Sequence, residues 1–338
     1  MSDRVTIEMT DGVADVRLNR PDKMNAIDGA MFKALAQAGE SLKADNSLRA
    51  VVLSGEGRAF CAGLDFASFN KMAEDDSPRA SNELEDLEGR ITHRGQQAAY
   101  AWTELPVPVI CAVTGVALGG GFQIAMGADI RIIAPDARMS VLEIRWGLIP
   151  DMTGTQTLVQ HVGLDVAKEL TFTGRMVEGP EAVALGLATR VSDTPLDDAL
   201  AMAHEIAGKS PHAIRAAKRL LNNAEHLSTA ERFQQERTEI GALIGSPNQA
   251  EAVLAYFEKR DPVFADPRAV SAADDILRNY QHIISDLKLV PATGGLFEVE
   301  VDGDLIYSKK SNGRHAEAGE VLGLFTDLVG PEVQRFPT

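Results

Sequence analysis

Alternating hydrophobic and polar residues open the chain. Residues 5–18 read VTIEM, a DG turn and then ADVRL, a pattern that predicts a β-hairpin with one apolar face. Residues 27–44 have helical spacing, with Asp28 placed to cap the helix. Apolar runs in RAVVLSGEG, VPVICAVTG and DIRIIAP predict buried strands, and FQIAMGA predicts a helix before the last of them. Strands alternating with helices indicate an α/β domain with crossover connections.

The pattern changes twice further along the chain. Residues from about 195 to 260 show helical periodicity throughout, and DPVFADPRA then has the composition of a linker. After it come a helix, a clear hairpin in LFEVEVDGDLIYSKK, and a last helical segment. We therefore predict a core at 1–195, a helical region at 196–265 and a small α+β extension at 266–338.

Composition narrows the classes of function. The chain of 338 residues is 45% hydrophobic and 24% charged, and its net charge of −16 argues against nucleic acid as a partner. No apolar run approaches the roughly 20 residues of a membrane span, and the first residues lack a secretory pattern. Cys61 and Cys111 form neither a disulfide framework nor a metal-ligand spacing. We expect a cytoplasmic protein without a metal site. The acidic stretch 73–90 is expected to be a solvated surface insertion.

Three segments carry candidate chemistry. FCAGLDF (60–66) and ALGGGFQ (117–123) each predict a turn from a strand into a helix, where backbone amides are left unsatisfied and attract negative charge. A phosphate loop would need a Gly-Lys-Ser/Thr ending or GxGxxG spacing, and the glycine run has neither. An amide pair that receives a developing oxyanion fits better, because it needs donors and no cation. The third segment, MSVLEIRWGLIPDMTGTQ, carries Glu143 in an apolar setting and Asp151 eight residues later.

Together these segments resemble the crotonase (enoyl-CoA hydratase/isomerase) superfamily. The resemblance covers roughly residues 3–262, and its motifs are LNRPDKMNAID, RAVVLSGEGRAFCAGLD, CAVTGVALGGGFQIAMGADIRI, LEIRWGLIPDMTGTQ, FTGRMVEGPEAVALGLATRV and YFEKR. It implies a ββα spiral core that binds acyl-CoA thioesters, with the helices near 195–260 forming a homotrimer or a dimer of trimers. Coenzyme A enters as part of the substrate, and no separate cofactor is implied.

The resemblance also assigns residues to the site. The thioester carbonyl would lie between the backbone amides of Ala62 and Gly120, which would stabilise an enolate by roughly 3–4 kcal/mol per donor. The contacts to the adenine and phosphates of coenzyme A would come from Lys23, Asn25, Ala26, Arg58 and, near the C-terminal helix, Lys259.

The reaction depends on a departure from the family pattern. Hydratases of the family use two glutamates, and the first falls on Gln123, whose amide cannot transfer a proton near neutral pH. The second falls on Glu143, and dienoyl-CoA isomerases carry a carboxylate at the position of Asp151. We slightly favour isomerisation by Glu143 and Asp151, with one of the pair protonated at pH 7. The alternatives are a hydratase in which Glu143 works alone while Gln123 holds water, and a weakly catalytic acyl-CoA-binding or scaffold protein.

The extension resembles a second family. Residues 294–320 are similar to the second half of the selenoprotein W-like (Rdx) family, which has a thioredoxin-like fold. That family's redox motif precedes the matching part, and this extension contains no cysteine. We therefore expect a docking or oligomer-shaping module and no redox activity.

Overall fold

The chain forms two compact units, residues 1–207 and residues 208–338. The computed structural model describes residues 4–65, 87–265, 267–285, 287, 297–312, 314, 316 and 319–333. Most of the acidic stretch predicted as a surface insertion, 73–90, lies outside these residues.

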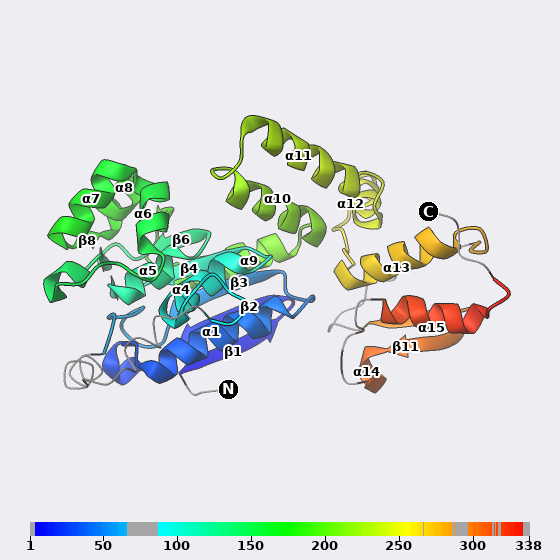
Figure 1. Ribbon diagram of the computed structural model, residues 1–338, viewed down its shortest axis with the longest axis horizontal. Helices are drawn as coiled ribbons and strands as arrows, with labels where there is room; N and C mark the ends of the chain where they lie inside the picture. The colour runs from blue at the N-terminus through cyan, green and yellow to red at the C-terminus, as the bar shows by residue number, and fades with distance from the viewer. Residues whose placement is uncertain are drawn as a thin grey trace. The chain divides into compact units, whose positions relative to one another are not determined.

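A six-stranded sheet forms the centre of the first unit (Figure 1). Its first two strands pair antiparallel and the others run parallel. The turn between the first two has Asp11 and Gly12 at positive φ, the geometry that a two-residue hairpin favours, so the predicted hairpin is confirmed. In spatial order the strands are β1 (Val5–Thr10), β2 (Val13–Leu18), β3 (Ala50–Gly55), β4 (Val109–Val113), β6 (Ile130–Ile133) and β9 (Arg190–Val191).

The central strands β3 and β4 are buried on both faces, as the continuous hydrophobic runs predict. In β3, Val51 and Leu53 belong to the main core, whereas Ala50 and Val52 belong to a second core on the other face. The second core is closed by α9 (Pro195–Ala207), which contributes Ala199 and Ala203. The main core includes residues of α1 (Gly29–Lys43), α4 (Arg94–Glu104) and α5 (Gly120–Met126).

A smaller sheet carries the site region beside the main one. It contains β5 (Val116–Leu118), β7 (Arg138–Ser140) and β8 (Val177–Glu178). A bridge between Cys61 and Ala117 ties the segment after β3 to β5. The short 3-10 helices η1 (Pro21–Lys23) and η2 (Glu143–Trp146) follow β2 and β7. Helices α6 (Gly154–Val162), α7 (Leu164–Thr173) and α8 (Gly179–Leu185) lie together at one end of this unit (Figure 1).

The second unit contains the helices and hairpin predicted for the later chain. Its first helices, on which large apolar side chains such as Phe233 and Tyr256 are exposed, are α10 (Pro211–Asn223), α11 (Thr229–Leu243) and α12 (Pro247–Glu258). The extension has its own small core around Tyr280, Tyr307 and Phe325. The elements that contribute to that core are α13 (Pro267–Tyr280), β10 (Glu298–Val301), β11 (Asp304–Ser308) and α15 (Glu320–Val329), whereas α14 (Lys309–Asn312) has no buried residue.

The contact boundary between the units falls after Ala207. Helix α9 therefore packs with the core sheet, although the sequence pattern assigns residues 196–207 to the helical region. The division of the chain into three functional parts stays a prediction. Across the described residues, no helix combines the length and the apolar character needed to cross a membrane.

Candidate active site

The three glycines of the run 119–121 are constrained in different ways. Gly119 has a φ of 52°, in the range that favours glycine, and a Cβ there would lie 3.5 Å from Glu143 Oε1. A Cβ on Gly120 would meet Met152 Sδ at 3.0 Å, and one on Gly121 would meet Cys61 Cβ at 2.6 Å. The run is therefore the place where β5 turns into α5 while three other segments approach its backbone.

Gly120 is the first residue of α5, so its amide has no partner in the preceding turn of the helix. No acceptor for this amide is recorded anywhere in the described part of the chain. The amide just before it, that of Gly119, donates to the Ser140 carbonyl at 3.0 Å. Gly120 thus offers a free backbone donor, as the sequence predicts for one half of the carbonyl site.

The turn after β3 supplies a second donor, but at a different residue from the one inferred. The Ala62 amide donates to the Met24 carbonyl at 2.9 Å, and the Asp65 amide to the Ile27 carbonyl at 2.9 Å. The Gly63 amide donates to the Cys61 sulfur. Among the four amides from 62 to 65, only that of Leu64 has no recorded acceptor in the described residues. The structure does not support Ala62, because its N–H is already used, and points to Leu64.

The two turns lie against one another. Gly63 has a φ of 88°, and a Cβ on it would lie 2.7 Å from the Leu118 carbonyl oxygen and 3.9 Å from Gly119 Cα. The Leu118 amide in turn donates to the Cys61 carbonyl at 3.0 Å. The segments that carry the Leu64 and Gly120 amides are thus fixed side by side through their backbones.

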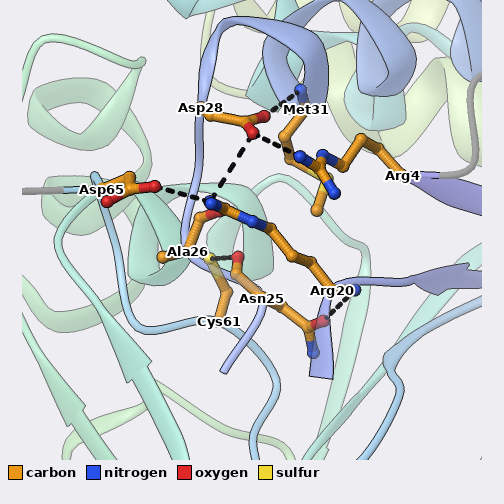
Figure 2. A network of polar contacts seen from close by, with 8 residues as sticks. All are labelled: Arg4, Arg20, Asn25, Ala26, Asp28, Met31, Cys61 and Asp65. Carbon is orange, nitrogen blue, oxygen red and sulfur yellow. Dashed lines mark hydrogen bonds and ion pairs between the residues drawn. The ribbon is translucent and has the colours of Figure 1, made fainter. Parts of the chain in front are cut away.

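Arg20 anchors the end of the turn after β3 through Asp65 (Figure 2). Its Nη1 donates to the Ala26 carbonyl at 2.9 Å and contacts Asp65 Oδ2 at 2.8 Å and Asp28 Oδ2 at 3.6 Å. Asp28 caps α1 by accepting from the Met31 amide at 2.8 Å. One largely buried guanidinium therefore holds the loop before α1 and the end of the turn after β3 in one arrangement.

Gln123 is fully buried. Its side-chain oxygen accepts two hydrogen bonds, one for each lone pair. The Oε1 atom accepts from the amides of Met152 at 2.7 Å and Gly154 at 3.0 Å. These two backbone donors identify which end of the side chain is the oxygen. The Nε2 atom donates to Glu143 Oε1 at 2.6 Å. With both lone pairs engaged, Oε1 has no capacity to hold a water molecule, so the structure argues against the role of water holder considered from the sequence.

Glu143 has one fixed and one unengaged oxygen. Its side chain is buried, and no partner for Oε2 is recorded within the described residues. Burial is the largest cause that raises the pKa of Glu143, and the negative charge of Asp151 raises it further. The hydrogen bond from Gln123 acts in the opposite direction and lowers the pKa. The net shift is upward from the ordinary value of 4.5, as expected for a general base or acid operating nearer neutrality.

Asp151 is exposed and lies at the edge of a pocket of about 600 Å³. The sequence placed Glu143 and Asp151 eight residues apart, and the structure brings them close enough for the charge of one to affect the other. Glu143 does not line the pocket itself. The two carboxylates thus occupy different depths, with Glu143 beside the glycine run and Asp151 at the pocket wall.

The residues predicted to contact coenzyme A differ in how accessible their side chains are. Lys23 and Arg58 are exposed in the first unit, and Lys259 is exposed in the second unit. The Asn25 side chain is fully buried and donates to the carbonyls of Glu56 at 3.0 Å and Ala59 at 2.8 Å while its oxygen accepts from the Arg20 amide. Its side chain is thus engaged in holding the loop rather than available to a ligand.

The Ala26 amide donates to the Lys23 carbonyl at 3.0 Å, and its own carbonyl accepts from Arg20. Three residues that shape the site escaped sequence reasoning, namely Arg20, Leu64 and Met152. Nothing in the residue types distinguishes a free amide from an engaged one, so only the backbone path reveals Leu64.

Comparison with known proteins identifies the family of this site. A model of the enoyl-CoA hydratase/isomerase family matches residues 8–267. The chain belongs to the enoyl-CoA hydratase/isomerase family. This confirms the predicted resemblance and the α/β spiral fold that it implied. The family model called Rdx matches residues 265–327, which confirms the resemblance in the extension.

Relatives from several species match about three quarters of the chain. Mouse mitochondrial methylglutaconyl-CoA hydratase is 32% identical over 258 residues, which are 74% of this chain and 79% of that protein. The short-chain-enoyl-CoA hydratase of Clostridium acetobutylicum is 32% identical over 261 residues, 76% of this chain and 95% of that protein. The crystal structure of an enoyl-CoA hydratase from Bacillus anthracis superposes with a TM-score of 0.70 at 29% identity, covering 77% of this chain and 98% of that one.

Proposed function

We propose that this member of the enoyl-CoA hydratase/isomerase family binds an enoyl-CoA thioester with its carbonyl oxygen between the amides of Leu64 and Gly120. Two preorganised donors would stabilise the enolate that forms when an α-proton leaves, each by about 3–4 kcal/mol. Support comes from the amides of Leu64 and Gly120, which have no recorded acceptor among the described residues and lie on turns that contact each other. Stabilisation of an enolate oxygen by backbone amides also needs no lysine or arginine. Lys23, Arg58 and Lys259 are the proposed contacts to the coenzyme A phosphates.

The observation that carries the proposal is the hydrogen bonding of Gln123. Because Gln123 is fixed by two backbone amides and donates to Glu143 Oε1, Glu143 is held as an acceptor with Oε2 open for a proton. Glu143 lies beside Gly119, which suits proton removal from the carbon next to the thioester. One base next to the enolate site and one acid farther along the acyl chain is the arrangement that double-bond migration requires.

The proposed reaction is isomerisation of an enoyl- or dienoyl-CoA. Glu143 Oε2 takes a proton from C2, the electron pair forms the enolate, and the conjugated system accepts a proton at a carbon farther along the chain. The proton that Glu143 has taken is passed to that carbon by way of Asp151, so both carboxyl groups return to their starting states at the end of the cycle. This shuttle needs no reactant other than the thioester.

Hydration of a 2-enoyl-CoA is the second candidate, and the names of the relatives favour it. In this mechanism Glu143 alone activates the water molecule for attack on the double bond and transfers its proton. Replacement of one of two acid–base groups typically lowers the rate by about 10²–10⁴, so we expect hydration to be slow. A weakly catalytic acyl-CoA-binding protein is the third candidate, and the open Oε2 of Glu143 speaks against it.

Turnover of three substrates separates these functions. Purified full-length protein is mixed with a 3-enoyl-, a 3,5-dienoyl- and a 2-enoyl-CoA, and the ultraviolet absorbance of the thioester is followed. Isomerisation predicts conversion of the first or second, lost in Glu143→Gln and in Asp151→Asn. Hydration of the 2-enoyl substrate that requires Glu143 but is indifferent to Asp151→Asn would support the second candidate. Absence of turnover with measurable binding would leave the third.

Assembly can be measured on the same sample. We propose a homotrimer or a dimer of trimers, supported by the large apolar side chains exposed on α11 and α12. Sedimentation equilibrium should give three or six copies, and a monomer at micromolar concentration would contradict this. A truncation that removes 266–338 should alter assembly or solubility while turnover per site is kept.

A further inference from the structure

The pocket beside Asp151 is formed by two segments of the chain. One lies between residues 148 and 156, and the other between residues 91 and 100. The first segment is tied to the site, because the amides of Met152 and Gly154 hold the Gln123 side chain. A Cβ on Gly120 would lie 3.0 Å from Met152 Sδ, so the pocket begins close to the proposed position of the thioester carbonyl.

The second segment consists of a loop and the start of α4. In the loop, the Leu87 amide donates to the Thr92 carbonyl at 2.9 Å, and the Arg90 amide donates to the Leu87 carbonyl at 2.9 Å. These bonds close residues 87–92 into one turn. The position of Arg90 therefore governs the positions of Ile91 and Thr92, which both line the pocket.

Arg90 ties this turn to two helices. Its Nη2 atom contacts Glu40 Oε2 of α1 at 2.6 Å, and its Nη1 atom contacts Glu104 Oε2 of α4 at 3.4 Å. The two helices are in close contact, since a Cβ on Gly39 of α1 would lie 2.5 Å from Ala101 Cβ of α4. One guanidinium thus fixes the turn to a pair of helices that belongs to the main core.

A buried polar chain joins the same carboxylate to the pocket. Gln97 Nε2 donates to Glu104 Oε2 at 3.0 Å, so the oxygen of this amide faces Thr92. The Thr92 hydroxyl donates to that oxygen at 2.5 Å, and both side chains are buried. Glu104 is therefore the point at which the contacts from Thr92 and from Arg90 meet.

The contribution of Arg90 is one of position more than of stability. Its side chain is 27% exposed, and those of Glu40 and Glu104 are 43% and 24% exposed. Ion pairs with this much exposure contribute little to the free energy of unfolding. Without them, however, the turn would keep only its backbone bonds and the Thr92 hydroxyl, and residues 91–93 could move away from the pocket.

We infer that Arg90 is a positioning residue for the acyl group: through Glu40 and Glu104 it holds residues 91–93 in place as one wall of the pocket. The position of this wall determines how much of a long acyl chain is buried. The inference rests on the proposed function, since it takes the pocket to be the place of the acyl chain. Arg90 is not among the described residues that line the pocket, so it acts only through its neighbours.

Binding of two saturated thioesters measures this effect without any chemistry. The probes are butyryl-CoA and octanoyl-CoA, which have no double bond to move, and calorimetry on the full-length protein gives the Kd of each. The ratio of the two Kd values cancels the contribution of coenzyme A. Each buried methylene contributes about fourfold to binding, so a displaced wall that exposes part of the longer chain should weaken octanoyl-CoA by about tenfold. Arg90→Gln should show this loss, with butyryl-CoA changed by no more than about twofold.

Turnover should show the same division. With a long-chain 3-enoyl-CoA, Arg90→Gln should raise KM by about tenfold and leave kcat unchanged, because the carbonyl site and Glu143 are untouched. Arg90→Lys keeps a cation beside Glu40 and Glu104 and should retain most of the wild-type ratio.

Arg175→Gln is the matched control. Arg175 also contacts two glutamates, Glu169 at 2.6 Å and Glu181 at 2.8 Å, and its side chain is 33% exposed. It is absent from the described lining of the pocket. Loss of these ion pairs should leave the ratio of the two Kd values at its wild-type value.

Salt gives a readout that needs no variant. Added NaCl screens partly exposed ion pairs, so the preference of the wild type for octanoyl-CoA should fall as the salt concentration rises. In Arg90→Gln the preference should be low and should not depend on salt.

An unchanged ratio in Arg90→Gln would overturn the inference, as would equal losses for both thioesters or the same change in Arg175→Gln. Failure of the proposed function has a different signature: the wild type would turn over no enoyl thioester, while the binding ratio would still respond to Arg90→Gln. A wild type that binds neither saturated thioester would contradict both.

Discussion

Restoring a carboxylate at position 123 is the sharpest test of how this site works. In Gln123→Glu, one carboxylate oxygen would take the place of the present Oε1, between the amides of Met152 and Gly154, which already converge on an oxygen. The other oxygen would face Glu143 Oε1 across the distance that now joins it to Gln123 Nε2, 2.6 Å. No other change of shape is required.

The electrostatic repulsion between the two carboxylates follows from that distance. Two like charges 2.6 Å apart repel by about 6 kcal/mol at an effective dielectric constant of about 20. The pair therefore keeps one proton at pH 7. That proton occupies the position of the present N–H donor, so the variant should have the charge and hydrogen-bond pattern of the wild type. It would, however, gain an exchangeable proton where the amide has none, and hydration of a 2-enoyl-CoA should rise by about 10²–10⁴.

The assay is formation of the 3-hydroxyacyl-CoA, followed by loss of enoyl absorbance and confirmed by mass spectrometry. Below the ordinary glutamate pKa of about 4.3, the Tm should match that of the wild type. The shared proton has a raised pKa in the folded state, so its contribution to stability is lost as the pH rises from that ordinary value through the folded-state pKa; at pH 6 the variant should already be less stable than the wild type. The double variant Gln123→Glu, Glu143→Gln serves as the control and should be inactive. A variant that folds normally but hydrates no faster than the wild type would refute the reasoning.

Three further predictions use other residues of the chain. Asp151→Asn removes a negative charge that raises the pKa of Glu143. The acid limb of the pH profile for exchange of the substrate's α-proton with solvent, followed by NMR, should therefore move to lower pH. An unchanged acid limb would show that Asp151 and Glu143 do not interact. Gly121→Ala puts a Cβ 2.6 Å from Cys61 Cβ and should lower the free energy of unfolding in urea by about 1–3 kcal/mol. Gly241→Ala in α11, where a Cβ meets nothing within 4 Å, should raise it by about 0.5–1 kcal/mol, and equal losses in both would contradict the packing argument. Burial raises the pKa of Cys61 to about 12, so this thiol should resist a maleimide at pH 8 until the protein is unfolded; rapid labelling of the native protein would show that the turn opens.

The elements that sequence patterns predicted best are those with a strong period. The β1–β2 hairpin, the capped helix α1 and the strands β3, β4 and β6 follow directly from alternation, from Asp28 as a cap and from apolar runs. The short strands β5 and β7 have three residues each, and too few side chains exist in such a strand to show a period.

The site was predictable as residue types but not as hydrogen bonds. Glu143 and Gln123 come together as the resemblance implied, because the family motif encodes their positions along the chain. The roles of their atoms depend on which N–H groups the folded backbone leaves free, and that is decided by partners from distant segments. Ala62 and Leu64 differ by two positions, and only the contact of Ala62 with the Met24 carbonyl distinguishes them.

The Arg20 network has a consequence for how this protein can change over evolution. Asp65 is the last described residue before position 87, and Arg20 fixes it to the loop that precedes α1. The chain therefore leaves the turn after β3 from a residue that is held in place. Insertions, deletions or a wholly different sequence beyond that point can be sampled without a shift of the Leu64 amide. The position of the Leu64 amide is thereby separated from sequence change beyond Asp65, and this separation depends on one arginine.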